Sequence, residues 1–366
     1  MISIRTLVSP QRSRLPKRLL IFRLLRFLNK MPSSCSVWRI AAIVGCVFLK
    51  STGSLSAQEL SESVLTKVRS ATVEVHFHGQ LRGGGVFVKS SDGKEFVLTA
   101  AHLFPSPKDT CTVVASDDEV LFATLTAYDL GHDLALLEVG PEASKYGALK
   151  IASKTPQETE PIFNFGPALR RRTLVLSGNV ADSRTCYTDF SASEGYIEHY
   201  FAGGINPVLT SGGTWVNRKG EIVGVQHGRL IGDEGAPSSG LSMVSPPAAI
   251  SNLIEKRAVA STPSIGGYVW EVWTADRQLL SRLPKGIHGV VASPIFKGRP
   301  LDKAGIKNSD VIVSCDGSKI RRRHELLEAI RSKPPGTTFT LEVISPGSGK
   351  RRTVYLTTDT LEALWQ

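Results

Sequence analysis

Short runs of apolar or alternating residues dominate the chain beyond residue 70. Turn-forming Gly, Asp and Ser residues separate these runs, and a period of two is typical of strands with one buried face. Many short strands at such spacing favour an antiparallel barrel or sandwich, and therefore a mainly β fold. The strands predicted in this part of the chain are residues 71–77, 86–88, 96–98, 112–115, 121–127, 134–139 and 222–225.

Two segments have apolar residues at helical spacing instead. Residues 58–69 precede the first predicted strand, and residues 324–332 lie near the C-terminus. We therefore predict one amphipathic helix in each. The apolar faces consist of Leu60, Val64, Leu65 and Val68 in the first helix, and of Leu326, Leu327 and Ile330 in the second.

The segment 258–267 is rich in small residues, Pro and Gly, which is typical of a linker between domains. Beyond it, the helix at 324–332 is accompanied by strands predicted at 288–292, 311–315, 337–344 and 353–357. A length of 366 residues also favours about two folded units. The predicted organisation is a leader over residues 1–57, a first domain over 58–258, and a second over 259–366 that includes the short linker.

The formal net charge of +11 belongs to the N-terminus. Residues 1–57 contain ten Lys or Arg and no Asp or Glu, which leaves +1 of that charge for the rest. A nearly neutral pair of domains argues against a nucleic-acid-binding protein.

An apolar run at residues 40–49 follows Arg39, and small residues lead from it to Ala57. This order is typical of an export signal, for which we predict cleavage after Ala57. The run is shorter than the ~20 apolar residues of a membrane-spanning helix, but an uncleaved leader that anchors the chain stays an alternative. The start is open between Met1 and Met31. We expect a periplasmic or extracellular protein, with membrane contact only through an uncleaved leader.

Three cysteines lie beyond the leader: Cys111, Cys186 and Cys315. An odd number argues against a scaffold built on disulfides. A bridge between Cys111 and Cys186 fits an oxidising compartment, and burial as small apolar side chains is the alternative that we favour. The sequence contains no CxxC pair, and no third metal ligand accompanies His76 and His78. We therefore expect neither a metal nor a cofactor.

Three residues suited to covalent catalysis occur in the order His, Asp, Ser. His102 ends Thr-Ala-Ala-His after a predicted strand, Asp133 precedes the run 134–139, and Ser211 opens Ser-Gly-Gly. A serine hydroxyl needs an imidazole to take its proton, and a buried carboxylate fixes the tautomer of that imidazole. We therefore predict a catalytic triad of His102, Asp133 and Ser211, in one of the known chain orders.

These segments resemble trypsin-like peptidases, and more closely the HtrA/Deg-type proteases, which pair such a domain with a PDZ domain. The resemblance covers residues 60 to 358. It implies a trypsin-like double β-barrel followed by a small α+β PDZ domain, and assembly into a homo-oligomer, a trimer. Further segments that carry it are residues 83–86, 164–167, 177–180 and 240–246 in the first domain, and 289–291, 300–306 and 310–317 in the second.

One position departs from the family pattern, because active members have Gly two residues before the serine and this chain has Leu209. The N–H groups of Leu209 and Ser211 would form the oxyanion hole, where each donor is worth roughly 3 kcal/mol in the transition state. Backbone angles that Gly permits there cost a residue with a Cβ about 1 to 3 kcal/mol. Two hypotheses stay open: a hole that forms when substrate or the PDZ domain reorganises the loop, and a domain that has lost catalysis.

The specificity of the first domain is predicted from three positions. In this fold the base of the primary pocket lies a few residues before the nucleophile, where Ile205 stands, so we expect an apolar pocket. Gln226 and His227 end a segment that resembles the strand pairing with the substrate backbone. A solvated loop edge is the alternative for these two residues.

The PDZ resemblance implies that an extended peptide binds between a strand and the helix at 324–332. Backbone amides of the loop before that strand would receive the C-terminal carboxylate. Tyr268, Val269 and Trp270 would belong to this loop, where Trp270 replaces a smaller residue.

The sequence thus predicts an exported serine endopeptidase of HtrA type that hydrolyses unfolded or damaged proteins. Its partners would be polypeptide substrates and C-terminal peptides, without nucleic acid. The alternative is a catalytically silent, peptide-binding scaffold, because Leu209 replaces the glycine of the oxyanion hole.

Overall fold

The computed structural model describes residues 60–168, 171–190, 195–205, 207–230 and 240–365. The span Leu60–Gln366 forms one compact unit. The leader predicted at residues 1–57 lies outside the described residues.

The first described helix is α3 (Glu62–Ala71). Ser61 caps its N-terminus, because the Ser61 hydroxyl accepts a hydrogen bond from the Val64 N–H at 3.3 Å. Glu62 in the first turn and Arg69 in the last turn carry the charges that suit the helix dipole. The helix predicted before the first strand is confirmed, with a later start than the pattern indicated.

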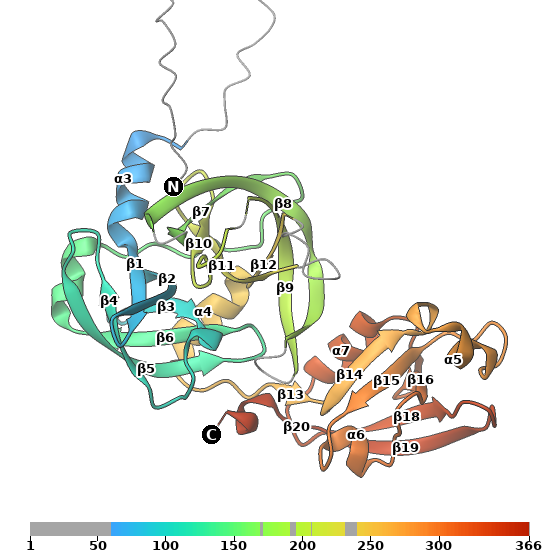
Figure 1. Cartoon of the computed structure of the whole chain (residues 1–366). Coiled ribbons are helices and arrows are strands. Elements are labelled where there is room, and N and C mark those ends of the chain that lie inside the picture. Colours follow the sequence, from blue (N-terminus) through green and yellow to red (C-terminus); the bar gives the residue numbers. More distant parts are fainter. Residues whose placement is uncertain (1–59, 169–170, 191–194, 206, 231–239, 366) are drawn as a thin grey trace, which may run out of the picture. The chain divides into compact units, whose positions relative to one another are not determined.

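Six strands after α3 close into a first β-barrel (Figure 1). They pair in the order β1-β2-β3-β6-β5-β4. Exposed and buried residues alternate from Val120 to Ala127, so the period of two places one face of β5 in the interior. The six strands predicted here are confirmed: β1 (Thr72–Phe77), β2 (Gln80–Lys89), β3 (Glu95–Ala100), β4 (Thr110–Val114), β5 (Val120–Asp129) and β6 (Leu134–Val139).

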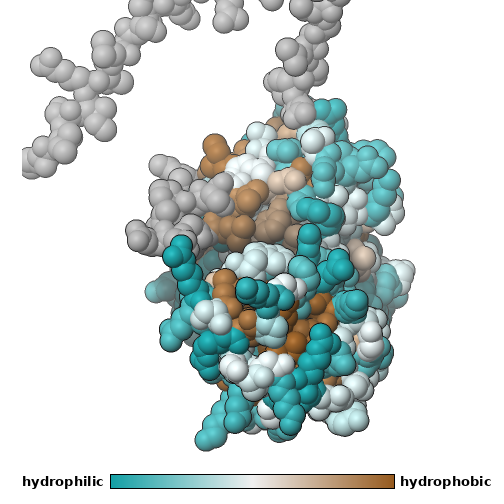
Figure 2. All heavy atoms as spheres, turned by 90° about the vertical axis from the view of Figure 1, so that its right-hand side faces the viewer, coloured by the Kyte–Doolittle hydropathy of each residue, from teal (hydrophilic) through white to brown (hydrophobic). Residues whose placement is uncertain are grey.

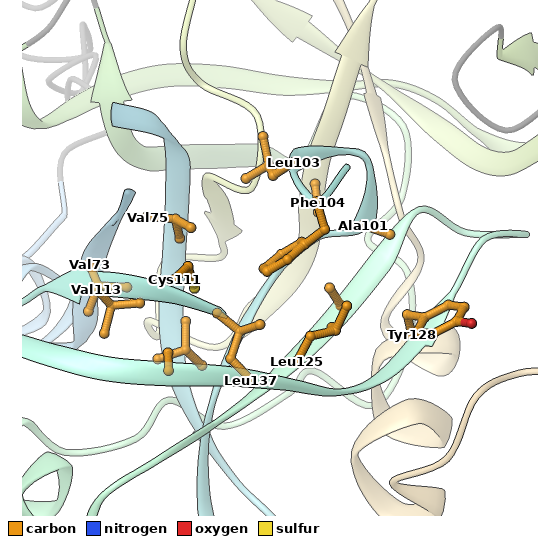
Figure 3. Packing of buried hydrophobic residues seen from close by; sticks show 14 of the residues in the cluster. Val73, Val75, Ala101, Leu103, Phe104, Cys111, Val113, Leu125, Tyr128 and Leu137 are labelled. Carbon is orange, nitrogen blue, oxygen red and sulfur yellow. The ribbon is translucent and has the colours of Figure 1, made fainter. Parts of the chain in front are cut away.

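Apolar side chains from these strands and from the 3-10 helix η1 (Ala101–Leu103) fill the first barrel. Figure 3 shows Val75, Phe104 and Leu137, from three segments, in this cluster. Phe104 packs edge-on against Phe77, with ring centroids 5.0 Å apart. Burial of such a side chain stabilises the folded state by about 1.5 to 3 kcal/mol. The burial of Phe104 therefore helps to hold the segment that carries His102.

Six more strands close into a second barrel, in the order β10-β11-β12-β9-β8-β7. Of these six strands, the apolar pattern predicted only β11, and the segment 240–246, which carries part of the family resemblance, contains β12. The long strand β8 was missed, because its sequence has no clear period and contains Gly, Asn and Asp. The strands are β7 (Pro161–Ala168), β8 (Arg171–Phe190), β9 (Gly195–Gly204), β10 (Thr214–Val216), β11 (Ile222–Arg229) and β12 (Leu241–Val244).

A second apolar cluster joins the two barrels. It contains Leu98 and Leu134 from the first barrel, and Phe165 and Val225 from the second. Helix α4 (Pro247–Lys256) adds side chains to the same cluster. The shared core fixes the junction between the barrels and includes residues of strands β3 and β11.

The C-terminal part is built on a third sheet, in the order β14-β15-β16-β18-β19, with β17 (Ser318–Lys319) beside β16. Helix α7 (Arg323–Arg331) buries Leu326, Leu327 and Ile330, as predicted. Short helices α5 (Arg277–Ser281) and α6 (Pro300–Lys303) lie in the connections. The strands of the sheet are β14 (Gly267–Glu271), β15 (Val290–Ile295), β16 (Val311–Cys315), β18 (Thr338–Ile344) and β19 (Arg351–Thr357), which confirms the four predicted ones.

The predicted linker is more ordered than its composition indicated. β13 (Pro263–Ser264) pairs with β20 (Asp359–Thr360), near the C-terminus. Thr262 donates its N–H to Glu362 Oε2 at 2.8 Å, and both residues are buried. The segment around Pro263 is therefore held by backbone pairing and by a buried hydrogen bond.

Cys111, Cys186 and Cys315 are all free in the structure, so the alternative of a bridge between Cys111 and Cys186 is wrong. Cys111 belongs to the core of the first barrel, where burial raises the pKa of its thiol to about 12. It acts as a small apolar side chain.

Candidate functional site

His102 lies in η1, directly after β3, and Asp133 directly precedes β6. The two side chains are in contact. Asp133 accepts two hydrogen bonds from His102: one from its N–H to Oδ1 at 2.8 Å, and one from ring Nδ1 to Oδ2 at 2.6 Å. A carboxylate only accepts, so the ring proton sits on Nδ1, and Nε2 is left as an acceptor. This is the tautomer that a general base for a serine hydroxyl requires.

The surroundings of His102 favour its charged form. Burial lowers the pKa of His102, but the charge of Asp133 and its hydrogen bond more than offset this, so that the pKa is raised above 6.5. Asp133 itself is only 2% exposed. An imidazolium formed during proton transfer would therefore be stabilised here.

The segment of Ser211 reaches the same junction through a close backbone approach. Gly84 donates its N–H to the Ser211 carbonyl at 2.8 Å. A Cβ on Gly83 would lie 2.3 Å from that carbonyl oxygen and 2.8 Å from Leu103 Cδ1, beside His102. Only glycine fits between the two segments, which explains the Gly-rich run in β2.

The Ser211 hydroxyl makes no hydrogen bond to another described residue. Catalytic hydrogen bonds are often long before substrate binds, so this geometry is compatible with a resting nucleophile. The structure thus brings His102 and Asp133 into direct contact, with Ser211 on the adjoining segment.

Leu209 has a φ of +69°, in the left-handed region. A residue with a Cβ pays about 1 to 2 kcal/mol for this conformation. The N–H groups of Leu209 and Ser211 donate to no described residue. Their role as oxyanion donors stays a prediction.

Ile205 is 75% exposed, so the structure does not place it at the base of a pocket. The prediction relied on distance along the chain from Ser211. It failed because the path of the loop before Ser211, not the count of residues, decides which side chain points inward.

Gln226 and His227 are 3% and 1% exposed, which contradicts both a substrate-binding edge and a solvated loop. The Gln226 N–H donates to the Gly213 carbonyl at 2.8 Å, and its carbonyl accepts from Gly212 at 2.7 Å. His227 lies at a bulge, because the pairing with β12 shifts between Gln226 and Gly228. Strand β11 therefore binds the nucleophile segment with its backbone at Gln226.

His227 has both ring nitrogens buried without a described hydrogen-bond partner. Its ring lies 5.6 Å from that of His199. Burial lowers the pKa of His227 to about 3, and that of His199 to about 4, so both rings are neutral. The pattern of apolar residues did not predict that these two imidazoles are buried.

His132 forms a second His–carboxylate contact next to Asp133. Its Nδ1 lies 2.8 Å from Asp129 Oδ2, and its Nε2 lies 3.7 Å from Glu198 Oε1. Burial lowers the pKa of His132, but the two carboxylates raise it overall to about 9. His132 is therefore a charged structural residue and not a second general base.

Tyr268, Val269 and Trp270 lie in strand β14 and not in a loop, so that part of the prediction is wrong. β14 is an edge strand of its sheet. The hydroxyl of Tyr196 donates to the Val269 carbonyl at 2.9 Å and accepts from its N–H at 2.6 Å. Trp270 bonds the Ser293 carbonyl through its indole N–H at 2.7 Å.

Several large apolar side chains of this C-terminal part are exposed. Figure 2 shows one face of the molecule, on which apolar side chains gather in patches bordered by hydrophilic ones. The large apolar residues that are exposed in the described part of 259–366 are Val259, Trp270, Trp273, Leu280 and Tyr355.

No group of three His, Cys, Asp or Glu suited to a metal is found among the residues that the structure describes. In the same part of the chain, no helix has the length and apolar character needed to cross a membrane.

Residues 83–225 match the family model of the trypsin-like peptidase domain, and residues 274–357 match that of the PDZ domain. A probable periplasmic serine endoprotease of DegP type from Chlamydia trachomatis is 26% identical over 275 residues, 73% of this chain and 52% of the relative. A serine protease of Do-like HtrA type from Lactobacillus helveticus is 26% identical over 274 residues, 71% of this chain and 65% of the relative. The chain thus matches about half to two thirds of the length of these relatives.

Solved structures show the same fold. The HtrA-type protease AlgW with a decapeptide aligns with a TM-score of 0.58 at 16% identity, over 81% of this chain and 97% of that one. A serine endoprotease from Yersinia pestis aligns with a TM-score of 0.54 at 19% identity, over 82% and 99%.

Proposed function

Because this chain is an HtrA-type protease with a trypsin-like domain and a PDZ domain, we propose that it is an active serine endopeptidase. The observation that carries the proposal is the pair of hydrogen bonds from His102 to Asp133, at 2.8 and 2.6 Å, beside the segment of Ser211. We assign the protease domain to residues 58–258 and the PDZ domain to residues 259–366.

In the proposed mechanism His102 Nε2 takes the proton of the Ser211 hydroxyl as its oxygen attacks the carbonyl carbon of the peptide bond. Asp133 keeps the ring oriented and stabilises the imidazolium. The N–H groups of Leu209 and Ser211 would donate to the oxyanion, and His102 would then return its proton to the leaving amine. Water repeats the sequence on the acyl-enzyme.

The proposed substrates are unfolded or damaged polypeptides outside the cytoplasm. The relative from Chlamydia trachomatis is named as periplasmic, which supports export of this chain. The decapeptide in the AlgW structure supports peptide binding by this protein as well. We further propose that C-terminal peptides bind along β14 and that the protein assembles as a homo-oligomer.

A fluorophosphonate probe, which reacts only with an activated serine, tests the activity. The wild-type chain should be labelled, and Ser211→Ala should not. Ser281→Ala removes an exposed serine elsewhere and should leave labelling unchanged. Casein cleavage should follow the same order. Absence of labelling and cleavage in the wild type, with and without a peptide ligand, would overturn the proposal.

A silent peptide-binding protein is the second candidate. The observation that favours it is the left-handed conformation of Leu209, which a glycine would adopt without cost. This candidate predicts peptide binding without turnover. Reproducible casein cleavage that Ser211→Ala abolishes would exclude it.

A further inference from the structure

A buried polar chain runs beneath the segment that precedes Ser211. The Trp215 indole N–H donates to Gln226 Oε1 at 3.0 Å, and Gln226 Nε2 donates to Thr210 Oγ1 at 2.7 Å. The Thr210 hydroxyl donates to the Pro207 carbonyl at 2.9 Å. Trp215, Gln226 and Thr210 are 1%, 3% and 3% exposed, so these hydrogen bonds are shielded from water.

The donor and the acceptor of each of these hydrogen bonds follow from the chemistry of the side chains. An indole N–H only donates, so the oxygen of the Gln226 amide must face Trp215. The Asn164 amide, 3.5 Å from the same oxygen, donates there too. The NH₂ group of Gln226 then faces Thr210, whose oxygen accepts and whose proton is left for the Pro207 carbonyl.

The backbone closes the arrangement around Thr210. The Gly213 N–H donates to the Thr210 carbonyl at 2.9 Å, and Gly212 donates to the Gln226 carbonyl at 2.7 Å. Thr210 is thus held through its side chain and its carbonyl at once. Leu209 lies between Pro207 and Thr210, the two residues that the Thr210 hydroxyl ties together.

We propose that Gln226 is a positioning residue, which acts through Thr210 to hold Leu209 in its left-handed conformation and so keeps two backbone N–H groups available for an oxyanion. The inference rests on the proposed function, because an oxyanion forms only if Ser211 attacks. It explains how a leucine is held in a conformation that a glycine would adopt without strain. Buried hydrogen bonds offset the cost of the Leu209 conformation.

Two pairs of variants, at Thr210 and at Gln226, test this series of buried hydrogen bonds. Thr210→Val keeps the shape of the side chain and removes the hydroxyl, and Thr210→Ser keeps the hydroxyl. With a fluorogenic peptide, kcat should fall roughly 10- to 100-fold in Thr210→Val, as expected for a misplaced oxyanion donor, with KM changed less than about twofold. Thr210→Ser should restore kcat to within roughly threefold of the wild type.

Gln226→Leu should lower kcat as Thr210→Val does. Gln226→Glu separates positioning from packing, because an ionised carboxylate accepts from Trp215 but cannot donate to Thr210. Protonation restores a donor. The ratio of the Gln226→Glu rate to the wild-type rate should therefore rise as the pH falls, which a purely structural role would not cause.

Crystal structures of the full chain supply a readout that needs no activity. Leu209 should keep its positive φ in the wild type and in Thr210→Ser, and lose it in Thr210→Val and Gln226→Leu. If the wild type neither reacts with the probe nor cleaves casein, the proposed function fails, and these structures alone decide the inference. A positive φ at Leu209 in both Thr210→Val and Gln226→Leu would overturn it, as would a kcat within threefold of the wild type in an active protein.

Discussion

At the scale of single residues, the contact of His102 with Asp133 determines how activity depends on pH. Only neutral His102 can take the Ser211 proton, and Asp133 raises the pKa of His102 above 6.5. We expect kcat/KM for a peptide to rise with pH through a midpoint above 6.5. His132→Gln, in the same pH series, controls for the neighbouring imidazole with a pKa of about 9. A midpoint at or below 6.5 would contradict the assignment of His102 as the base.

Gly83 gives a second prediction at this scale. Gly83→Ala places a Cβ 2.3 Å from the Ser211 carbonyl oxygen, so the nucleophile segment must move. A displacement near 1 Å costs roughly a hundredfold in rate, and we expect a loss of that order in casein cleavage.

Gly203→Ala is the matched control for Gly83→Ala, because its nearest neighbour, Ala181 Cβ, lies at an ordinary 3.6 Å. It should retain most of the activity. Equal activity of the two variants would show that the close approach at Gly83 is not required.

At the scale of elements, strand β14 has its edge groups at Val269 engaged by Tyr196. A peptide that adds to this edge must compete with the Tyr196 hydroxyl. Tyr196→Phe removes that hydroxyl and keeps the ring, so a C-terminal peptide should bind several-fold more tightly. Fluorescence anisotropy with a labelled peptide measures this.

Tyr355→Phe, on the exposed side of β19, is the control for Tyr196→Phe and should leave the affinity unchanged. Unchanged or weaker binding by Tyr196→Phe would mean that peptides do not use this part of β14.

The elements also show what a sequence can predict. β5 was predicted because its buried face repeats every two residues, and α7 because its apolar face repeats at helical spacing. β8 was missed because its pairing with β7 and β9, and not its own composition, makes it a strand. Propensity is a weak guide where tertiary contacts decide.

The candidate site divides in the same way. The contact between His102 and Asp133 agrees with the order of their segments in the sequence, and the catalytic role of Ser211 stays a prediction. Gln226 and His227 were misjudged, because a bulge and a buried amide leave no periodic signal. The prediction for Ile205 was wrong because the number of residues between Ile205 and Ser211 does not determine the path of the loop.

At the scale of the whole molecule, buried histidines predict how stability depends on pH. The pKa values of His199 and His227 are lowered to about 4 and about 3, and the unfolded chain binds these protons near pH 6.5. The two neutral rings therefore contribute fully to the free energy of unfolding above pH 6.5. This contribution is lost as the pH falls, by about 1 kcal/mol per pH unit for each ring.

The raised pKa of His132, about 9, acts in the opposite direction. Charged His132 contributes fully to the free energy of unfolding below pH 6.5, and this contribution is lost as the pH rises through 9. The free energy of unfolding by urea should therefore be largest near pH 6.5 to 7. His132→Gln should flatten only the alkaline side of this curve, and His199→Gln only the acid side. A curve that keeps falling from pH 5 to pH 9 would contradict this prediction.

The contact of Tyr196 with Val269 also bears on how copies of this chain behave when they are crowded together. An edge strand with free N–H and C=O groups is a template on which another chain can add, and such additions begin many aggregates. Because the Tyr196 hydroxyl covers one N–H and one C=O of β14, the contact that competes with a peptide also protects this edge from a wrong neighbour.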